Sequence, residues 1–570
     1  MNNIRFGKLG LRALLASLCL AVLASCGGGG STPDAHNGSV RPLSAEFTKR
    51  KAVAYSPYRT AANEAGLAAE QIPEANIKQD LDLLVTAGFG LIRVFDSDDK
   101  VGKGTLQVIS KYGLDMKVQL GVYLQSGNDG FNQAQLSRAA ALANAYKDIV
   151  LAVSVGNENM VSWSFNKISP AQMAGYLQTL RGQITQPITT DDNYAYWAGA
   201  GDSLVTDQID FASLHTYPEL DSVFAPGLWD WQQRNIPAAQ RAAAMMDAAI
   251  AEARHQYQQA RDHLDRMGRS DLPITIGETG WNAVNLGTLK FRAHPVNQKM
   301  YFDRLAIWAA EGRTGAGPKA VIYFEAFDEP WKQGDDKWGL FNVKRQARYV
   351  VKDLYPTSQW VPAGDTTEPA TAALTDADAV YFDPPVVNAA VTQDRYVVFA
   401  DTTTSSEARE TGLVFDPFVK TFWQASTDFA PGDGPTSYEV DPRPETWGWG
   451  MLYQSRAGVT SNLSNFANGN LHLSVKTTYA GKIEIGLISD TQDRVAAESY
   501  LQIASGSHGY VNDGAWHEVV IPIKDFVAQN PKLDLSLITG RFVLADRYAF
   551  TGNAAGSTTK LLIDAIYWTK

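Results

Sequence analysis

The sequence has few cysteines and few charged residues for its length. Two of its 570 residues are cysteine and 19% are charged, so a disulfide scaffold and a cysteine-based zinc site are excluded. The formal charge of −11, without a basic stripe, argues against nucleic acid as a partner. Neither a dinucleotide-binding glycine motif nor a P-loop follows an apolar run, so nucleotide binding has no support.

Residues 1–25 have the pattern of a secretory signal. Arg5, Lys8 and Arg12 carry positive charge without any acid, and the apolar run 13–23 follows. This run is too short to span a hydrocarbon core, which needs about 20 apolar residues. We therefore predict that residues 1–25 are a signal peptide.

A lipid anchor is predicted directly after this signal. Leu23-Ala24-Ser25-Cys26 resembles the lipobox of bacterial lipoproteins, which implies that Cys26 is acylated and holds the chain on a lipid membrane. The glycine-rich residues that follow indicate a flexible tether over 26–47. We expect an extracytoplasmic protein of the cell envelope. Gly27 after the cysteine resembles the sorting pattern of Gram-negative outer-membrane lipoproteins, which implies the outer membrane.

The middle of the chain alternates apolar runs with helical patterns. Between the sixth and seventh runs, residues 237–267 predict one long helix ended by Gly268. Buried strands alternating with helices indicate a parallel sheet, and eight such units favour a (β/α)8 TIM barrel over residues 48–358. The eight predicted strands are 51–55, 91–95, 116–122, 149–155, 188–190, 209–214, 274–276 and 320–324.

Carboxylates and aromatic residues follow these strands, where the chemistry of such barrels is located. Glu158 ends the fourth strand and Glu278 the seventh, so both are predicted to face each other across the barrel mouth as catalytic residues. Two carboxyl groups cleave a glycosidic bond without a cofactor, and a retaining mechanism needs them about 5–5.5 Å apart. We therefore expect no cofactor and no metal.

Other strand ends supply candidate substrate contacts. His215 is either a sugar contact or a satisfied buried histidine, and Trp281 is either a stacking wall or a core residue. Asp191 and Asp192 are interpreted as turn residues and are left out. The predicted substrate-binding residues are Tyr55, Phe95, Asp96, Asn157, His215, Tyr217, Trp281, Glu329 and Lys332.

Four short motifs, in order along the chain, resemble those of glycoside hydrolase family 17, over about residues 48 to 356. The resemblance implies a retaining β-1,3-glucan hydrolase or glucanosyltransferase with Glu158 as acid/base and Glu278 as nucleophile. It also implies that Glu329 and Lys332 support the site. The motifs are Arg93-Val94-Phe95-Asp96, Val155-Gly156-Asn157-Glu158, Gly277-Glu278-Thr279-Gly280-Trp281 and Phe327-Asp328-Glu329-Pro330-Trp331-Lys332.

Two positions depart from that family. Asn282 stands after Trp281 where members often have proline, and Asp335 stands where many carry glutamate. Neither is a predicted catalytic position, so the departures concern the subsites and the bond specificity.

Beyond a predicted linker over 359–378, helical periodicity is absent. Short alternating runs predict an all-β sandwich of jelly-roll type over 379–570, similar in pattern to carbohydrate-binding modules. Trp423, Trp447 and Trp449 are either stacking residues or core. The predicted strands are 396–399, 471–476, 483–488, 518–523, 541–544 and 561–567.

The predicted function is hydrolysis of a β-glucan polysaccharide or oligosaccharide, with transglycosylation left open. One alternative is a β-glycanase of the same clan with another linkage specificity. Another is a glycan-binding surface lipoprotein without activity, which the intact pair of glutamates disfavours. A structural role in the envelope is disfavoured because no repeats or heptads occur.

Overall fold

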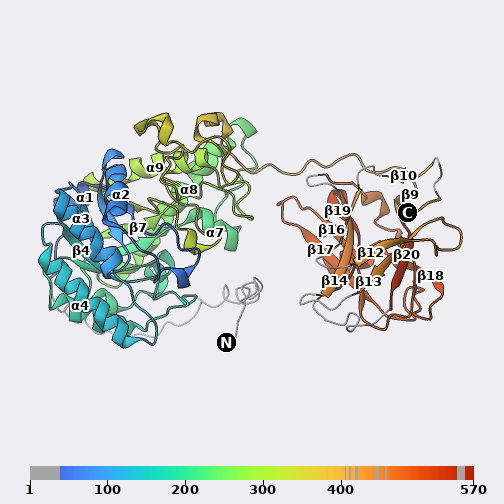
Figure 1. Ribbon diagram of the computed structural model, residues 1–570, viewed down its shortest axis with the longest axis horizontal. Helices are drawn as coiled ribbons and strands as arrows, with labels where there is room; N and C mark the ends of the chain where they lie inside the picture. Colours follow the sequence, from blue (N-terminus) through green and yellow to red (C-terminus); the bar gives the residue numbers. More distant parts are fainter. Residues whose placement is uncertain are drawn as a thin grey trace. The chain divides into compact units, whose positions relative to one another are not determined.

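The computed structural model (Figure 1) divides into two compact units, residues 1–382 and 383–570. It describes residues 39–402, 404, 406–409, 413–417, 422–442, 448–455, 459–547 and 559–570. The predicted signal peptide and Cys26 lie outside these ranges. Within them, no helix has both the length and the apolar composition that crossing a bilayer requires.

The first unit is a closed barrel in which β1 to β8 pair in sequence order and β8 pairs with β1, all in parallel. Each strand overlaps one of the eight predicted runs, which confirms the predicted fold. The strands are β1 (Lys51–Ala54), β2 (Phe89–Val94), β3 (Lys117–Val122), β4 (Val150–Asn157), β5 (Ile188–Asn193), β6 (Ala212–His215), β7 (Ile274–Thr279) and β8 (Val321–Tyr323).

Helices surround the strands (Figure 1). The predicted long helix is α8, Ala238–Arg266, and Gly268 follows it with a φ of +77°, a left-handed conformation that glycine adopts readily. The others in this unit are α1 (Ala45–Lys49), α2 (Glu74–Thr86), α3 (Gly104–Tyr112), α4 (Asp129–Ala145), α5 (Pro170–Arg181), α6 (Ser203–Thr206), α7 (Pro218–Phe224) and α9 (Pro295–Thr314).

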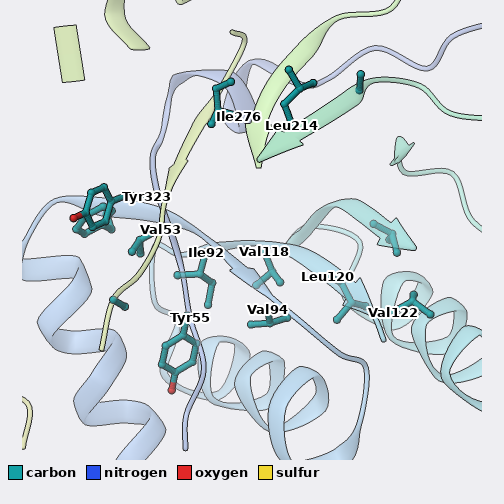
Figure 2. Close-up of a cluster of buried hydrophobic side chains, with 14 of the residues drawn as sticks. Val53, Tyr55, Ile92, Val94, Val118, Leu120, Val122, Leu214, Ile276 and Tyr323 are labelled. Atoms are coloured by element: carbon teal, nitrogen blue, oxygen red, sulfur yellow. The ribbon is translucent and has the colours of Figure 1, made fainter. Parts of the chain in front are cut away.

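The core lies between the barrel and its helices. Because side chains alternate along a strand, Ile92 and Val94 of β2 pack in this layer (Figure 2), whereas Arg93 between them bonds to Asp191 and Glu278 from other strands. Strands buried on both faces read as continuous apolar runs. The side chains that face the helices are apolar, so a polar residue within such a run, here Arg93, points to the inside of the barrel.

Residues 39–47, which we expected to belong to a flexible tether, pack against the barrel. The backbone N–H of Arg41 donates to Asp210 (2.8 Å), and its guanidinium donates to backbone carbonyls of Arg181 and Gln186. Helix α1 buries Phe47 beside Phe211, with ring centroids 5.9 Å apart, in a cluster that includes Ala52 of β1. Residues 39–47 are therefore not part of a tether, because they contribute to the core.

We expect Phe47→Ala to destabilise the barrel by about 3–5 kcal/mol, because a buried phenylalanine side chain leaves a cavity when it is removed. Urea unfolding of the barrel, followed by tryptophan fluorescence, measures this. Val85→Ala on α2, where the side chain is 41% exposed, is the control and should change the midpoint little. A similar small shift for both variants would contradict a core role for Phe47.

The segment 359–378, expected as a linker, is also packed on the first unit. Glu368 is buried and forms an ion pair with Arg348 (2.7 Å), which also pairs with Asp328 after β8 (2.6 Å). Thr371 donates its hydroxyl to the Ala347 carbonyl (3.0 Å). Proline and threonine content indicated mobility, but these buried polar contacts hold the segment in place.

The second unit contains two β-sheets, as predicted for a sandwich. In one sheet the order is β10-β9-β20-β13-β12, with β15 pairing with β20 and β18; in the other it is β11-β14-β19-β16-β17. Residues of both sheets form one core. The elements are β9 (Arg395–Phe399), β10 (Ala408–Arg409), β11 (Leu413–Pro417), β12 (Phe422–Ser426), β13 (Ser437–Asp441), β14 (Gly448–Ser455), β15 (Asn470–Thr477), β16 (Ile483–Ser489), β17 (Ala497–Ile503), β18 (Trp516–Pro522), α10 (Ile523–Gln529), β19 (Ile538–Arg547) and β20 (Leu561–Thr569).

Candidate active site

Glu278, at the end of β7, is buried and held by three neighbours. Arg93 from β2 donates to Oε1 (2.5 Å), and the Tyr217 hydroxyl donates to Oε2 (2.7 Å). His215 Nδ1 lies 3.5 Å from Oε2. These side chains reach the carboxylate from β2, β6 and the residue before α7, so barrel closure assembles them.

These neighbours keep Glu278 ionised. Burial alone would raise the pKa of this carboxyl, but the charges of His215 and Arg93 and the hydrogen bonds from Tyr217 and Arg93 lower the pKa to about 2. At neutral pH the group is therefore a carboxylate fixed in position, as a nucleophile must be.

Glu158 has different surroundings. It follows β4 with a φ of +48°, and its backbone N–H donates to the Asp191 carbonyl (2.9 Å). The side chain is 36% exposed and Oε1 lies 3.0 Å from His215 Nδ1. The turn thus leaves the carboxyl group half open to the barrel mouth.

His215 brings the two glutamates together. Its Nδ1 contacts both, at 3.0 Å and 3.5 Å, so these two carboxylate oxygens lie at most 6.5 Å apart, the sum of the two distances. The ring is fully buried, and Nε2 has no hydrogen-bond partner among the residues that the structure describes. Burial would lower the pKa of His215, but the charges of Glu278 and Glu158 raise it.

Arg93 and Asp191 complete the site, and the sequence analysis missed both as site residues. The Arg93 guanidinium donates to Asp191 Oδ2 (2.8 Å) and Asn157 Oδ1 (2.6 Å) besides Glu278. Asp191, interpreted as a turn residue, is fully buried in β5, and Gln119 also donates to it (3.2 Å). The available signal was Arg93 itself, a cation within an otherwise apolar strand.

Asp192, also interpreted as a turn residue, is buried as well. It accepts from the backbone N–H of Met160 (2.7 Å), in the loop after Glu158. Burial raises its pKa to about 7, while the hydrogen bond from Met160 opposes this and the charge of Glu158 adds to it. The residue links the end of β5 to that loop.

Gly277 leaves room for this network. A methyl group in its place would lie 2.3 Å from Ser213 Oγ and 2.7 Å from Asp191 Oδ1. Glycine before Glu278 is therefore explained by the close approach of the Ser213 hydroxyl and the Asp191 carboxylate, not by its backbone conformation.

A second polar group lies after β8. Lys332 forms ion pairs with Glu329 and with Glu325 (3.4 Å), and its Nζ lies 4.3 Å from the ring centroid of Phe324 and 5.9 Å from that of Phe95. Burial raises the pKa of Glu325 well above its usual range. Burial would also raise the pKa of Glu329, but the charge of Lys332 together with hydrogen bonds from Glu325, Lys332 and Ser56 lowers it. Glu325 was not predicted.

Phe95 and Asp96 directly follow β2 and are partly buried. The Phe95 ring lies 4.7 Å from the Arg93 guanidinium and contacts Phe324 edge-on. Asp96 accepts from the backbone N–H of Asp98 (3.0 Å), and burial raises its pKa well above the usual range. Through Arg93, Phe95 adjoins the predicted catalytic residues.

Two predicted substrate contacts are corrected by the structure. Tyr55 is fully buried among the outward-facing side chains (Figure 2), and its hydroxyl donates to Asp80 of α2 (3.3 Å). Trp281 is also fully buried, with its indole N–H on the Arg292 carbonyl (2.9 Å) and its ring beside Tyr301. Both side chains belong to the core and cannot touch a substrate.

The remaining sequence predictions concern the lipid anchor and the tryptophans of the second unit. Cys26 and Trp447 lie outside the described residues, as does the side chain of Trp423. Trp449 is fully buried and donates to the Tyr479 hydroxyl (3.3 Å), which makes it a core residue. Among the residues that are described, no three His, Cys, Asp or Glu side chains gather as metal ligands.

Comparison with protein families gives one match for each unit. Residues 52–343, just over half of the chain, match the family described as "BtgE/BtgC glycoside hydrolase domain". Residues 390–570 match the family described as "Carbohydrate binding domain 30". The two matches coincide with the barrel and the sandwich.

Individual relatives are distant. The chain is 23% identical over 291 residues to a "Glucan 1,3-beta-glucosidase" of Arthroderma benhamiae, covering 48% of this chain and 84% of that protein. A "Probable glucan endo-1,3-beta-glucosidase btgC" of Aspergillus clavatus is 24% identical over 305 residues, covering 49% of this chain but 39% of the relative.

Among solved structures, an endo-laminarinase from Formosa Hel1_33_131 is similar in fold. Its TM-score is 0.51 at 23% identity, and the match covers 60% of this chain and 98% of that one.

Proposed function

Because the chain belongs, through its barrel, to the family of the BtgE/BtgC glycoside hydrolase domain, we propose that it hydrolyses β-1,3-glucan with retention of configuration. Glu278 acts as nucleophile and Glu158 as acid/base. One observation carries the proposal: the carboxylate of Glu278, which is buried, and that of Glu158, which is partly exposed, both lie within 3.5 Å of His215 Nδ1.

The separation of the carboxylates supports retention. Inverting enzymes place their carboxyl groups about 6.5–9.5 Å apart to admit a water molecule, and retaining enzymes about 5–5.5 Å apart. The facing oxygens of Glu158 and Glu278 lie within 6.5 Å of each other, which leaves little room for a water between them. This favours direct attack by Glu278.

The reaction follows from the two environments. Glu278, ionised and fixed by Arg93 and Tyr217, attacks the anomeric carbon while Glu158 gives its proton to the leaving oxygen. Glu158 then takes a proton from water, which releases the sugar from Glu278. Arg93 holds Asn157 through Oδ1, so the amide nitrogen is the donor for the 2-hydroxyl of the cleaved sugar.

The substrate class rests on resemblance. The motifs around Glu158 and Glu278 are similar to those of glycoside hydrolase family 17, and the curated relatives are named for action on 1,3-β-glucan. Transfer to a second glucan, in place of hydrolysis, uses the same glycosyl-Glu278 intermediate. Phe95, Asp96, Glu329 and Lys332 are proposed to contact the sugar around that intermediate.

We further propose roles for the parts of the chain outside the barrel. The sandwich binds glycan, which its match to a carbohydrate-binding domain supports. The signal and the lipobox-like Cys26 would hold the protein on the extracytoplasmic side of the envelope, at the outer membrane. Radiolabelled palmitate incorporation, compared between the wild type and Cys26→Ser, tests the anchor.

Chromatography of products tests the activity. The chain without its first 26 residues is incubated with laminarin and with a linear β-1,3-oligosaccharide. Short products from both support hydrolysis, and products longer than the starting oligosaccharide mean transfer. Cleavage of mixed-linkage glucan or mannan alone would contradict the substrate, and no reaction on any glycan would favour a binding protein.

A further inference from the structure

The loop between β4 and α5, which begins at Glu158, has an inverted pattern of burial. Trp163 is 59% exposed and Phe165 is 90% exposed, the highest value among the large apolar side chains that the structure describes. The polar Asn159, in contrast, is only 1% exposed. Aromatic residues normally supply core area, so this loop displays side chains that a folding requirement alone would bury.

Hydrogen bonds of two asparagine side chains, the buried Asn159 and the partly buried Asn166, fix the loop. Asn159 accepts from the backbone N–H of Asn157 (2.9 Å) and donates to the Asn166 carbonyl (2.7 Å). Asn166 accepts from the backbone N–H of Ser126 (2.6 Å) in the loop after β3 and donates to the Leu124 carbonyl. The two aromatic rings are therefore presented by an anchored segment, which lowers the entropy lost when a ligand binds.

The aromatic pair follows Glu158 in the same loop. Trp163 is five residues from Glu158, so their Cα atoms are no more than about 18 Å apart even with the chain fully extended. An acid that protonates the leaving oxygen lies next to the departing sugar. The part of a glucan that leaves therefore starts beside Glu158, the residue at which this loop begins.

We propose that Trp163 and Phe165 form a stacking platform for the leaving-group part of the glucan, on the far side of the scissile bond from Glu278. The apolar C–H faces of glucose rings pack on the exposed aromatic faces. This inference rests on the proposed function and adds the subsites that favour long chains and hold an incoming acceptor sugar.

Two substrates separate the platform from the catalytic centre. A β-1,3-glucan heptasaccharide occupies both sides of the scissile bond, whereas an aryl β-laminaribioside has only an aryl leaving group. We expect Trp163→Ala and Phe165→Ala each to lower kcat/KM for the heptasaccharide about ten-fold, the cost of losing roughly 1.4 kcal/mol of stacking. The aryl substrate should change less than about two-fold.

Matched variants complete the test. Ile307→Ala on α9, 60% exposed in the wild type, should leave both substrates unaffected, and Trp163→Phe should retain most of the activity on the heptasaccharide. Equal losses on both substrates, or no loss on the heptasaccharide, would overturn the platform. If the wild-type enzyme cleaved neither substrate, the proposed function itself would fail, a result distinct from these.

Discussion

Replacing Glu278 by glutamine is expected to lower kcat for glucan cleavage by at least about 10⁴-fold. An amide cannot form the glycosyl intermediate, while Arg93 keeps its ion pair with Asp191 and its bond to Asn157, so the pocket should persist. Initial rates on laminarin measure the loss, and calorimetry should show that the variant still binds a laminari-oligosaccharide.

Glu158→Ala distinguishes the two carboxylates. Because the acid helps the leaving group depart, this variant should lose most activity on glucan but much less on an aryl substrate with an acidic phenol. Azide should accelerate it and give a glycosyl azide of retained configuration, whereas with Glu278→Ala the configuration should be inverted. Azide products of the same configuration from both variants would contradict the assigned roles.

The barrel could be predicted because its strands are buried on both faces, and each therefore reads as a short apolar run between helical patterns. The positions of Glu158 and Glu278 followed from the rule that strand ends form the mouth. The packing of 39–47 and 359–378 could not be predicted in the same way. Their composition is that of mobile segments, and only tertiary contacts such as Phe47 with Phe211 or Arg348 with Glu368 reveal their packing.

The errors within the site have one physical cause. A strand end offers side chains on both faces, and sequence alone did not tell which face Tyr55 or Trp281 would use. Tyr55 reaches α2 and Trp281 reaches Arg292, whereas Arg93 and Asp191 bond across the barrel. Alternation along β2 would have separated Arg93 from Ile92 and Val94, so that part was predictable in principle.

Arg93→Met should both destabilise the barrel and change the pH profile. The substitution leaves the carboxylates of Asp191 and Glu278 buried without their shared cation, which costs about 3–5 kcal/mol. Loss of the positive charge also lets burial raise the pKa of Glu278 from about 2. Since kcat/KM requires ionised Glu278, the acid limb of the kcat/KM-against-pH profile should move to higher pH.

Two further variants separate stability from electrostatics. Arg345→Met removes another buried arginine, paired with Asp80 (2.9 Å) on the helix side of the barrel. It should destabilise the fold less than Arg93→Met does, because Arg59 still pairs with Asp80 (2.6 Å), and it should leave the acid limb in place. Adding Asp191→Asn to Arg93→Met removes one unpaired charge, so stability should partly return, while Glu278 still lacks its guanidinium. An acid limb that returned with stability in the double variant, or that moved equally in Arg345→Met, would mean that Arg93 only supports the fold. An acid limb that stays displaced in both Arg93 variants, and in them alone, assigns to Arg93 the task of keeping the nucleophile ionised.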